Sequence, residues 1–102
     1  MLEFDVYFRL EEEVFVWNGG KAKENRRKHG VSFEQACEAF FDPTALFVDA
    51  GTPEEFRSAV IGYTTEDAML FVVHLERQDG VIRVISARRA EPKERRLYED
   101  GE

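Results

Sequence analysis

The sequence has one cysteine, three prolines and no long apolar run in 102 residues. A single cysteine, Cys37, excludes an internal disulfide. No stretch approaches the roughly 18 apolar residues of a membrane span, and the N-terminal residues are acidic where a secretory signal would be basic and then apolar. These absences predict a cytoplasmic, single-domain protein covering residues 1–102. Its hydrophobic fraction of 43%, with nine Phe, is enough for one core without a metal or another cofactor.

Positive charge is scarce overall but concentrated in two places. The net charge is −7, which argues against sequence-independent binding to a phosphate backbone. Five basic residues nevertheless lie within 21–28 and seven within 77–96, so these two segments hold 12 of the 14. If the segments meet in space, an otherwise acidic protein carries one basic face.

The first half of the chain predicts two short strands and two helices. Residues 4–10 alternate apolar and polar side chains as a strand does, and 14–17 form a second strand candidate. Asn18 is a candidate N-cap for a polar helix over 21–29, which Gly30 ends in a left-handed conformation.

The second helix has a stronger signature. Ser32, followed three residues later by Gln35, fits a capping box. Apolar residues then recur at helical spacing up to Phe41, so Cys37 is predicted to be a core residue. The helix ends at Asp42, because a residue before proline avoids the helical region.

The second half is rich in strand patterns and ends in a helix that starts at Pro92. Polar turn sequences separate the last three strands, which we expect to form an antiparallel meander with the first strand at its edge. The strand segments read "TALFVD", "RSAVIGYT", "MLFVVHLE" and "VIRVISAR". The predicted fold is therefore α+β: an antiparallel sheet of about four strands, packed by two N-terminal helices and one C-terminal helix.

Strand alternation suggests a site on one face of this sheet. In "FVVHLER", Phe71, Val73 and Leu75 would face the core, and His74 and Glu76 would lie about 7 Å apart on the open face. On the neighbouring strand we expect Ser86 and Arg88 to join His74, since Ile85 and Ala87 look like core residues.

A histidine, a carboxylate and arginines on one face would suit metal-independent RNA cleavage. A base removes the 2′-hydroxyl proton, an acid protonates the departing 5′-oxygen, and guanidinium groups stabilise the phosphate. Two plainer interpretations stay open: an ordinary exposed strand pair, and arginines in surface salt bridges. A non-catalytic module that docks nucleic acid or an acidic partner through the basic face fits the same residues. A transcription cofactor is a weaker alternative, because no helix-turn-helix pattern is seen.

Three segments together resemble a known family. "KAKENRRKHGVSFEQA", "VVHLER" with "IRVISARRA", and "ERRLYE" occur in the order found in the BrnT-type toxins of type II toxin–antitoxin systems. The resemblance runs from about Phe15 to Glu99. Residues 1–13 then look like an N-terminal extension or an extra edge strand.

This resemblance implies a RelE-like fold, in which helices cover one face of the sheet and RNA is cut without a metal on the other. It also implies a cognate BrnA-type antitoxin that blocks activity and brings DNA binding. The number of toxin copies that assemble is left open, with a homodimer and a heterotetramer as the alternatives. The implied catalytic residues are His74, Glu76, Arg83, Arg88 and Tyr98, and the implied RNA contacts are Lys28, Arg57 and Arg89. His74 or Glu76 would be the base, the two catalytic arginines would stabilise the phosphate, and Tyr98 would be an orienting or acid group.

Overall fold

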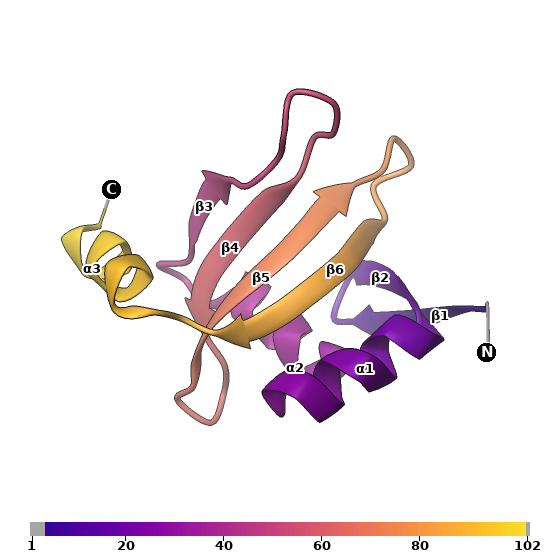
Figure 1. Ribbon diagram of the computed structural model, residues 1–102, viewed down its shortest axis with the longest axis horizontal. Helices are drawn as coiled ribbons and strands as arrows, with labels where there is room; N and C mark the ends of the chain where they lie inside the picture. Colours follow the sequence, from indigo (N-terminus) through magenta and orange to yellow (C-terminus); the bar gives the residue numbers. More distant parts are fainter. Residues whose placement is uncertain (1–3, 102) are drawn as a thin grey trace.

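The computed structural model describes residues 4–101, so residues 1–3 of the predicted extension lie outside the described residues. Within that range the chain is α+β, as predicted, with six strands in one sheet, three α-helices and one 3-10 helix (Figure 1). The elements in chain order are β1 (Asp5–Leu10), β2 (Glu13–Asn18), α1 (Gly19–His29), α2 (Phe33–Glu38), the 3-10 helix η1 (Ala39–Phe41), β3 (Leu46–Asp49), β4 (Ser58–Tyr63), β5 (Met69–Glu76), β6 (Ile82–Arg89) and α3 (Pro92–Asp100).

The sheet is larger than predicted, and it is mixed. Its strand order is β1-β2-β6-β5-β4-β3. The antiparallel pairing of β3 through β6 confirms the predicted meander with the first of these strands at its edge. The prediction of about four strands, all antiparallel, was wrong: β1 and β2 add a hairpin, and β2 pairs parallel to β6 at Phe15↔Ile82 and Val16↔Arg83. The alternation of apolar and polar residues predicts a strand but not which strand lies next to it. More than sixty residues of chain separate β2 from β6, so their pairing could not be predicted from local patterns.

The main core lies between the sheet and the first two helices. Phe15 and Trp17 of β2 pack there with Phe33 and Cys37 of α2, and all four are at most 2% exposed. The prediction that Cys37 is a core residue is confirmed. The third helix, α3, lies well away from α1 and α2, beside β4 (Figure 1). None of the helices among residues 4–101 is long and apolar enough to span a membrane.

The predicted N-caps and the predicted stop at Gly30 are confirmed, although α1 begins at Gly19 and not at residue 21. The Asn18 side chain accepts a hydrogen bond from the Lys21 N–H, and Ser32 accepts one from the Gln35 N–H at 3.0 Å. Gly30 ends α1 with φ 71°, a value that glycine adopts without the steric cost of a Cβ. The second helix departs from the prediction, because α2 tightens into η1 at Ala39.

A buried amide joins α1 to the sheet. Asn25, 7% exposed, donates from Nδ2 to the carbonyl oxygens of Val31 and Ala87, and its Oδ1 accepts from the Ala87 N–H at 3.1 Å. The printed pairing of β2 with β6 covers Ile82 and Arg83. At Ala87 the Asn25 amide therefore takes the place of a neighbouring strand.

Candidate active site

His74 lies on the helix-covered face of the sheet. The prediction placed Phe71, Val73 and Leu75 in the core and His74 on the open face, and this was wrong. Leu70 and Val72 are fully buried in the main core. His74 lies two residues farther along β5, so it shares their face, and it is 5% exposed. Because both faces of β5 carry apolar side chains, alternation could not decide which face meets the helices.

Two aromatic rings enclose the His74 imidazole. Phe40 of η1 meets it edge to face with ring centroids 4.7 Å apart, and Phe47 of β3 does so at 5.9 Å. This burial lowers the pKa of His74, although the Val72 carbonyl and the Glu76 charge act in the opposite direction. The imidazole is therefore neutral near pH 7.

One nitrogen of this neutral imidazole is committed to the backbone. His74 Nδ1 lies 3.1 Å from the Val72 carbonyl oxygen. A carbonyl oxygen only accepts, so Nδ1 carries the proton and donates it to this bond. Nε2 is then the acceptor, which is the form that a general base requires.

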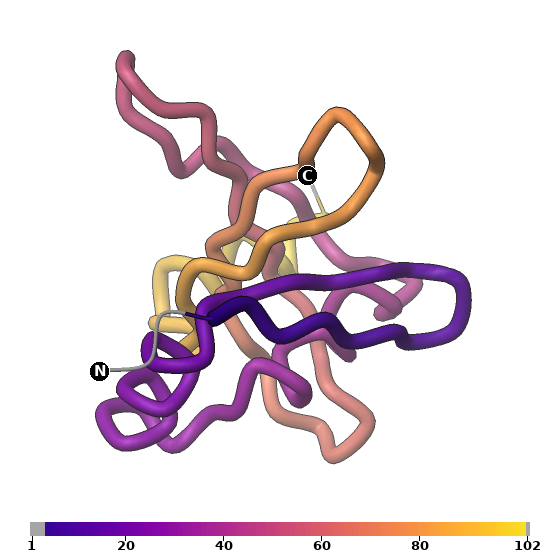
Figure 2. Tube along the Cα trace, turned by 90° about the vertical axis from the view of Figure 1, so that its right-hand side faces the viewer, coloured from indigo at the N-terminus to yellow at the C-terminus, as the bar shows by residue number. Residues whose placement is uncertain are grey.

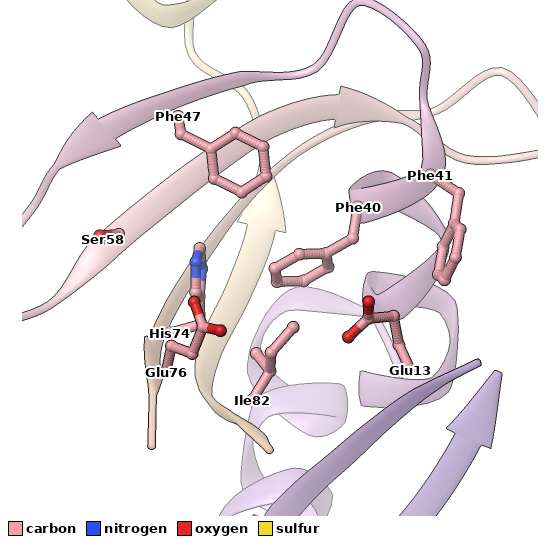
Figure 3. Close-up of a pocket in the computed structure, with 8 residues that line it drawn as sticks. All are labelled: Glu13, Phe40, Phe41, Phe47, Ser58, His74, Glu76 and Ile82. Atoms are coloured by element: carbon pink, nitrogen blue, oxygen red, sulfur yellow. The ribbon is translucent and has the colours of Figure 1, made fainter. Parts of the chain in front are cut away.

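His74 and Glu76 line the same cavity, which agrees with the prediction that the two side chains lie on one face of the strand. Its volume is about 490 Å³. Figure 3 shows Phe40 and Phe47 on one side of His74, Glu76 close to His74, and Glu13 farther across, beyond Phe40. The lining residues are Glu13, Phe40, Phe41, Phe47, Ser58, His74, Glu76 and Ile82. Sequence reasoning missed Glu13 and Ser58, since they come from strands whose pairing only the fold establishes.

A second hollow continues from this cavity toward Arg57. Phe47, Ser58 and Glu76 line both, and Arg57 and Phe56 line the second. Phe56 is 96% exposed. The guanidinium of Arg57 forms an ion pair with Glu55, with nitrogen and oxygen 3.0 Å apart, while its buried Nε is without a hydrogen-bond partner among the described residues. Of the predicted RNA contacts, Arg57 is thus the one that lies beside the His74 cavity.

Arg88 lies on the opposite face from His74, so the prediction that Ser86 and Arg88 join His74 was wrong. Ser86 pairs with Val73 and Arg88 with Phe71, whereas His74 pairs with Val84 after a register shift. The Arg88 guanidinium lies over the Phe71 ring, 4.5 Å from its centroid. The register shift has a separate effect: it puts Arg83 and Ala87 on different faces, whereas the sequence predicted that they share one.

An ion pair holds Arg88 to the C-terminal helix. Arg88 donates two hydrogen bonds to the carboxylate of Glu94, at 2.9 and 2.8 Å. Burial alone would raise the pKa of Glu94, but Arg88 and the Glu91 N–H lower it overall. Arg88 therefore ties α3 to β6.

Arg83 and Tyr98 also have partners away from the cavity. Arg83, paired in register with Leu75, donates to Asp5 at 2.9 Å. Tyr98 of α3 donates to Asp42 Oδ2 at 2.7 Å. Burial of the Tyr98 hydroxyl and the charge of Asp42 raise its pKa, although the hydrogen bond with Thr44 acts in the opposite direction.

The two basic segments do not form one continuous face. Lys28 is exposed in the last turn of α1. Arg89 is also exposed and pairs with Leu70, whose side chain faces the helices, so Arg89 leaves the sheet on that side. Arg88 leaves on the other. Alternation along β6 therefore divides the predicted basic face between the two sides of the sheet.

Comparison with known proteins gives the family. The model of the BrnT ribonuclease toxins of type II toxin–antitoxin systems matches residues 17–94. The matched region contains His74, Glu76 and Arg57, and it leaves out β1 and Tyr98. A search of curated proteins found no match. Among residues 4–101 no three His, Cys, Asp or Glu side chains are grouped to hold a metal ion. Because the match covers most of the chain, this protein belongs to the BrnT family of ribonuclease toxins, whose systems pair each toxin with an antitoxin.

Proposed function

We propose that the chain is a metal-independent endoribonuclease that cuts RNA at the His74 cavity and is neutralised by a cognate antitoxin. The observation that carries this proposal is the placement of His74 in the cavity, with Nδ1 bonded to the Val72 carbonyl oxygen and Nε2 left as the acceptor. The antitoxin would also supply any contact with operator DNA.

The residues of the cavity suit the first step of RNA cleavage. Nε2 of His74 takes the proton of a ribose 2′-hydroxyl, and the oxygen attacks the adjacent phosphorus. The bond to the 5′-oxygen breaks, leaving a 2′,3′-cyclic phosphate and a 5′-hydroxyl. The departing oxygen takes up a proton, for which Glu76 or Glu13 in its acid form would be the donor.

Arg57 is suited to hold the phosphate. Its partner Glu55 has a side chain that is 53% exposed, so the ion pair costs little to exchange for a phosphate oxygen. Phe47 and Phe56 expose rings beside it, and unpaired bases stack on such rings. Five further residues for which the resemblance implied a role do not line this cavity: Lys28, Arg83, Arg88, Arg89 and Tyr98.

The test is cleavage of a mixed-sequence RNA by the purified chain in excess chelator. His74→Asn is the informative variant, because its amide still donates to the Val72 carbonyl but has no basic nitrogen. We expect it to cut at least about 100-fold more slowly. His29→Asn, which changes the exposed histidine at the end of α1, is the matched control and should cut normally.

Further variants separate this site from the opposite face. Thermal unfolding must first show that each variant is folded. Normal cutting by His74→Asn together with loss of cutting in Arg88→Ala would move the site to the face that carries Arg88. Equal cutting by every variant would indicate a contaminating nuclease.

A second candidate is a non-catalytic binding module. The surface of α1 favours it, because five basic residues of this helix are exposed and one acidic residue, Glu24, lies among them. A folded wild-type chain that cuts no RNA in the presence or absence of divalent cations, yet binds it with a strong salt dependence, would favour this candidate.

A further inference from the structure

We propose that β1 is a dimerisation edge, at which a second copy of this chain adds its own β1 antiparallel to the first. β1 is the outermost strand of the sheet and pairs with β2 over all six of its residues. Figure 2 shows the β1-β2 hairpin in front of the rest of the described chain. This strand lies outside residues 17–94, so ribonuclease family membership does not account for it.

The edge lacks most of the usual protections against pairing. Natural edge strands are blunted by prolines, bulges, very short length or charged side chains, and of these β1 has the charges of Asp5 and Arg9. β1 contains no proline, and its register with β2 is regular from Asp5↔Asn18 to Leu10↔Glu13. The opposite edge, β3, has four residues. β1 is therefore the better template for an added strand.

The hairpin geometry tells which backbone groups are free. A two-residue turn joins Leu10 to Glu13, and such a pair exchanges both of its hydrogen bonds. Residues alternate from there, so Asp5, Tyr7 and Arg9 direct their N–H and C=O groups away from β2. The Phe4 carbonyl, bonded to the Gly19 N–H at 3.0 Å, points inward as this alternation requires.

The sequence of the strand is complementary to itself about Tyr7. With a two-fold axis there, Tyr7 faces Tyr7 of the second copy and Asp5 faces Arg9. The outward N–H and C=O groups of these three residues then lie opposite the same groups of the second copy. Each Asp5–Arg9 pair joins opposite charges, which stabilises directly opposed residues. Asp5 already accepts from Arg83, and a carboxylate has further lone pairs for a second donor.

The same register also covers apolar surface. Val6 would face Phe8 of the second copy on the core side, where both are half-buried. On the other side the Tyr7 ring, 59% exposed, would pack against its equivalent. An isologous contact of this kind closes at two copies, so a dimer is expected and not a fibre.

The experiment is sedimentation equilibrium of the full chain over a wide concentration range. We expect a concentration-dependent dimer for the wild type and a monomer for Tyr7→Pro. Proline removes the outward N–H but is tolerated at this kind of edge position. Tyr7→Thr, which keeps the N–H in a residue that favours strands, is the matched control and should still dimerise.

A charge exchange tests the register. Arg9→Asp puts like charges opposite each other and should raise the dimer Kd roughly tenfold. Adding Asp5→Arg to it restores opposite charges and should recover most of the affinity. A wild-type monomer at every concentration would overturn the proposal, as would a dimer that is unaffected by Tyr7→Pro. A monomeric chain whose antitoxin affinity falls in Tyr7→Pro would assign the edge to the antitoxin instead.

Discussion

Replacing Asn25 by alanine should be among the most damaging single changes in the first half of the chain. Its side chain makes three hydrogen bonds to the backbone of Val31 and Ala87 at a site that is 7% exposed. Each such bond contributes about 1 kcal/mol, and buried groups left unpaired cost more. Alanine returns about 0.6 kcal/mol through its higher helix propensity. The net loss in the free energy of unfolding is therefore about 2–3 kcal/mol.

This loss can be measured by urea unfolding followed by the fluorescence of Trp17. Trp17 is the single tryptophan and is 2% exposed, so its emission reports on the main core. The midpoint should fall while the slope with urea stays the same, which would attribute the change to stability. Lys23→Ala, at an exposed position of α1, is the matched control and should change the free energy by less than about 0.5 kcal/mol.

A small loss in the free energy of unfolding would contradict this account of Asn25. A loss below about 1 kcal/mol for Asn25→Ala would mean that water or a shifted β2 satisfies the Ala87 backbone. The Asn25 amide would then not be what replaces the missing strand. Asn25→Asp keeps an acceptor for the Ala87 N–H but loses the donors to two carbonyls, so it should be at least as damaging.

Three further predictions follow from buried or paired groups. Burial lowers the pKa of His74 below its ordinary value near 6.5, so its contribution to the free energy of unfolding is complete above pH 6.5 and is lost as the pH falls. In urea unfolding, His74→Gln should therefore lose less free energy of unfolding between pH 7 and pH 5 than the wild type. An equal loss in the two proteins would contradict this. Burial raises the pKa of the Cys37 thiol, so a thiol reagent should label it in denaturant and not in the folded protein. Glu94→Gln weakens the bond to Arg88 and should lower the free energy of unfolding, measured with urea, by about 1–2 kcal/mol. An unchanged free energy of unfolding would contradict this.

Local signals in the sequence gave the elements reliably. The caps at Asn18 and Ser32, the left-handed Gly30 and the helix start at Pro92 all depend on residues within one turn of the position they act on. The core position of Cys37 depends on helical spacing, which is also local.

The candidate site was harder to predict, because its residues come from strands whose pairing is not local. The sequence placed His74 and Glu76 together, since two residues on one strand share a face. It could not bring Glu13 and Ser58 to them, and it assigned His74 to the wrong face of β5, so that Ser86 and Arg88, which pair with Val73 and Phe71, lie on the other side of the sheet.

The sequence by itself determined which segments form helices and strands, the helix caps, the helical core stripe and the resemblance to a toxin family, because these depend on short-range periodicity and on motifs in fixed order. Tertiary structure alone decided which face of β5 meets the helices, that β2 lies parallel to β6, and that Arg88 pairs with Glu94. Each of these depends on a choice between apolar faces or between partners far apart in the chain, and packing free energy makes that choice.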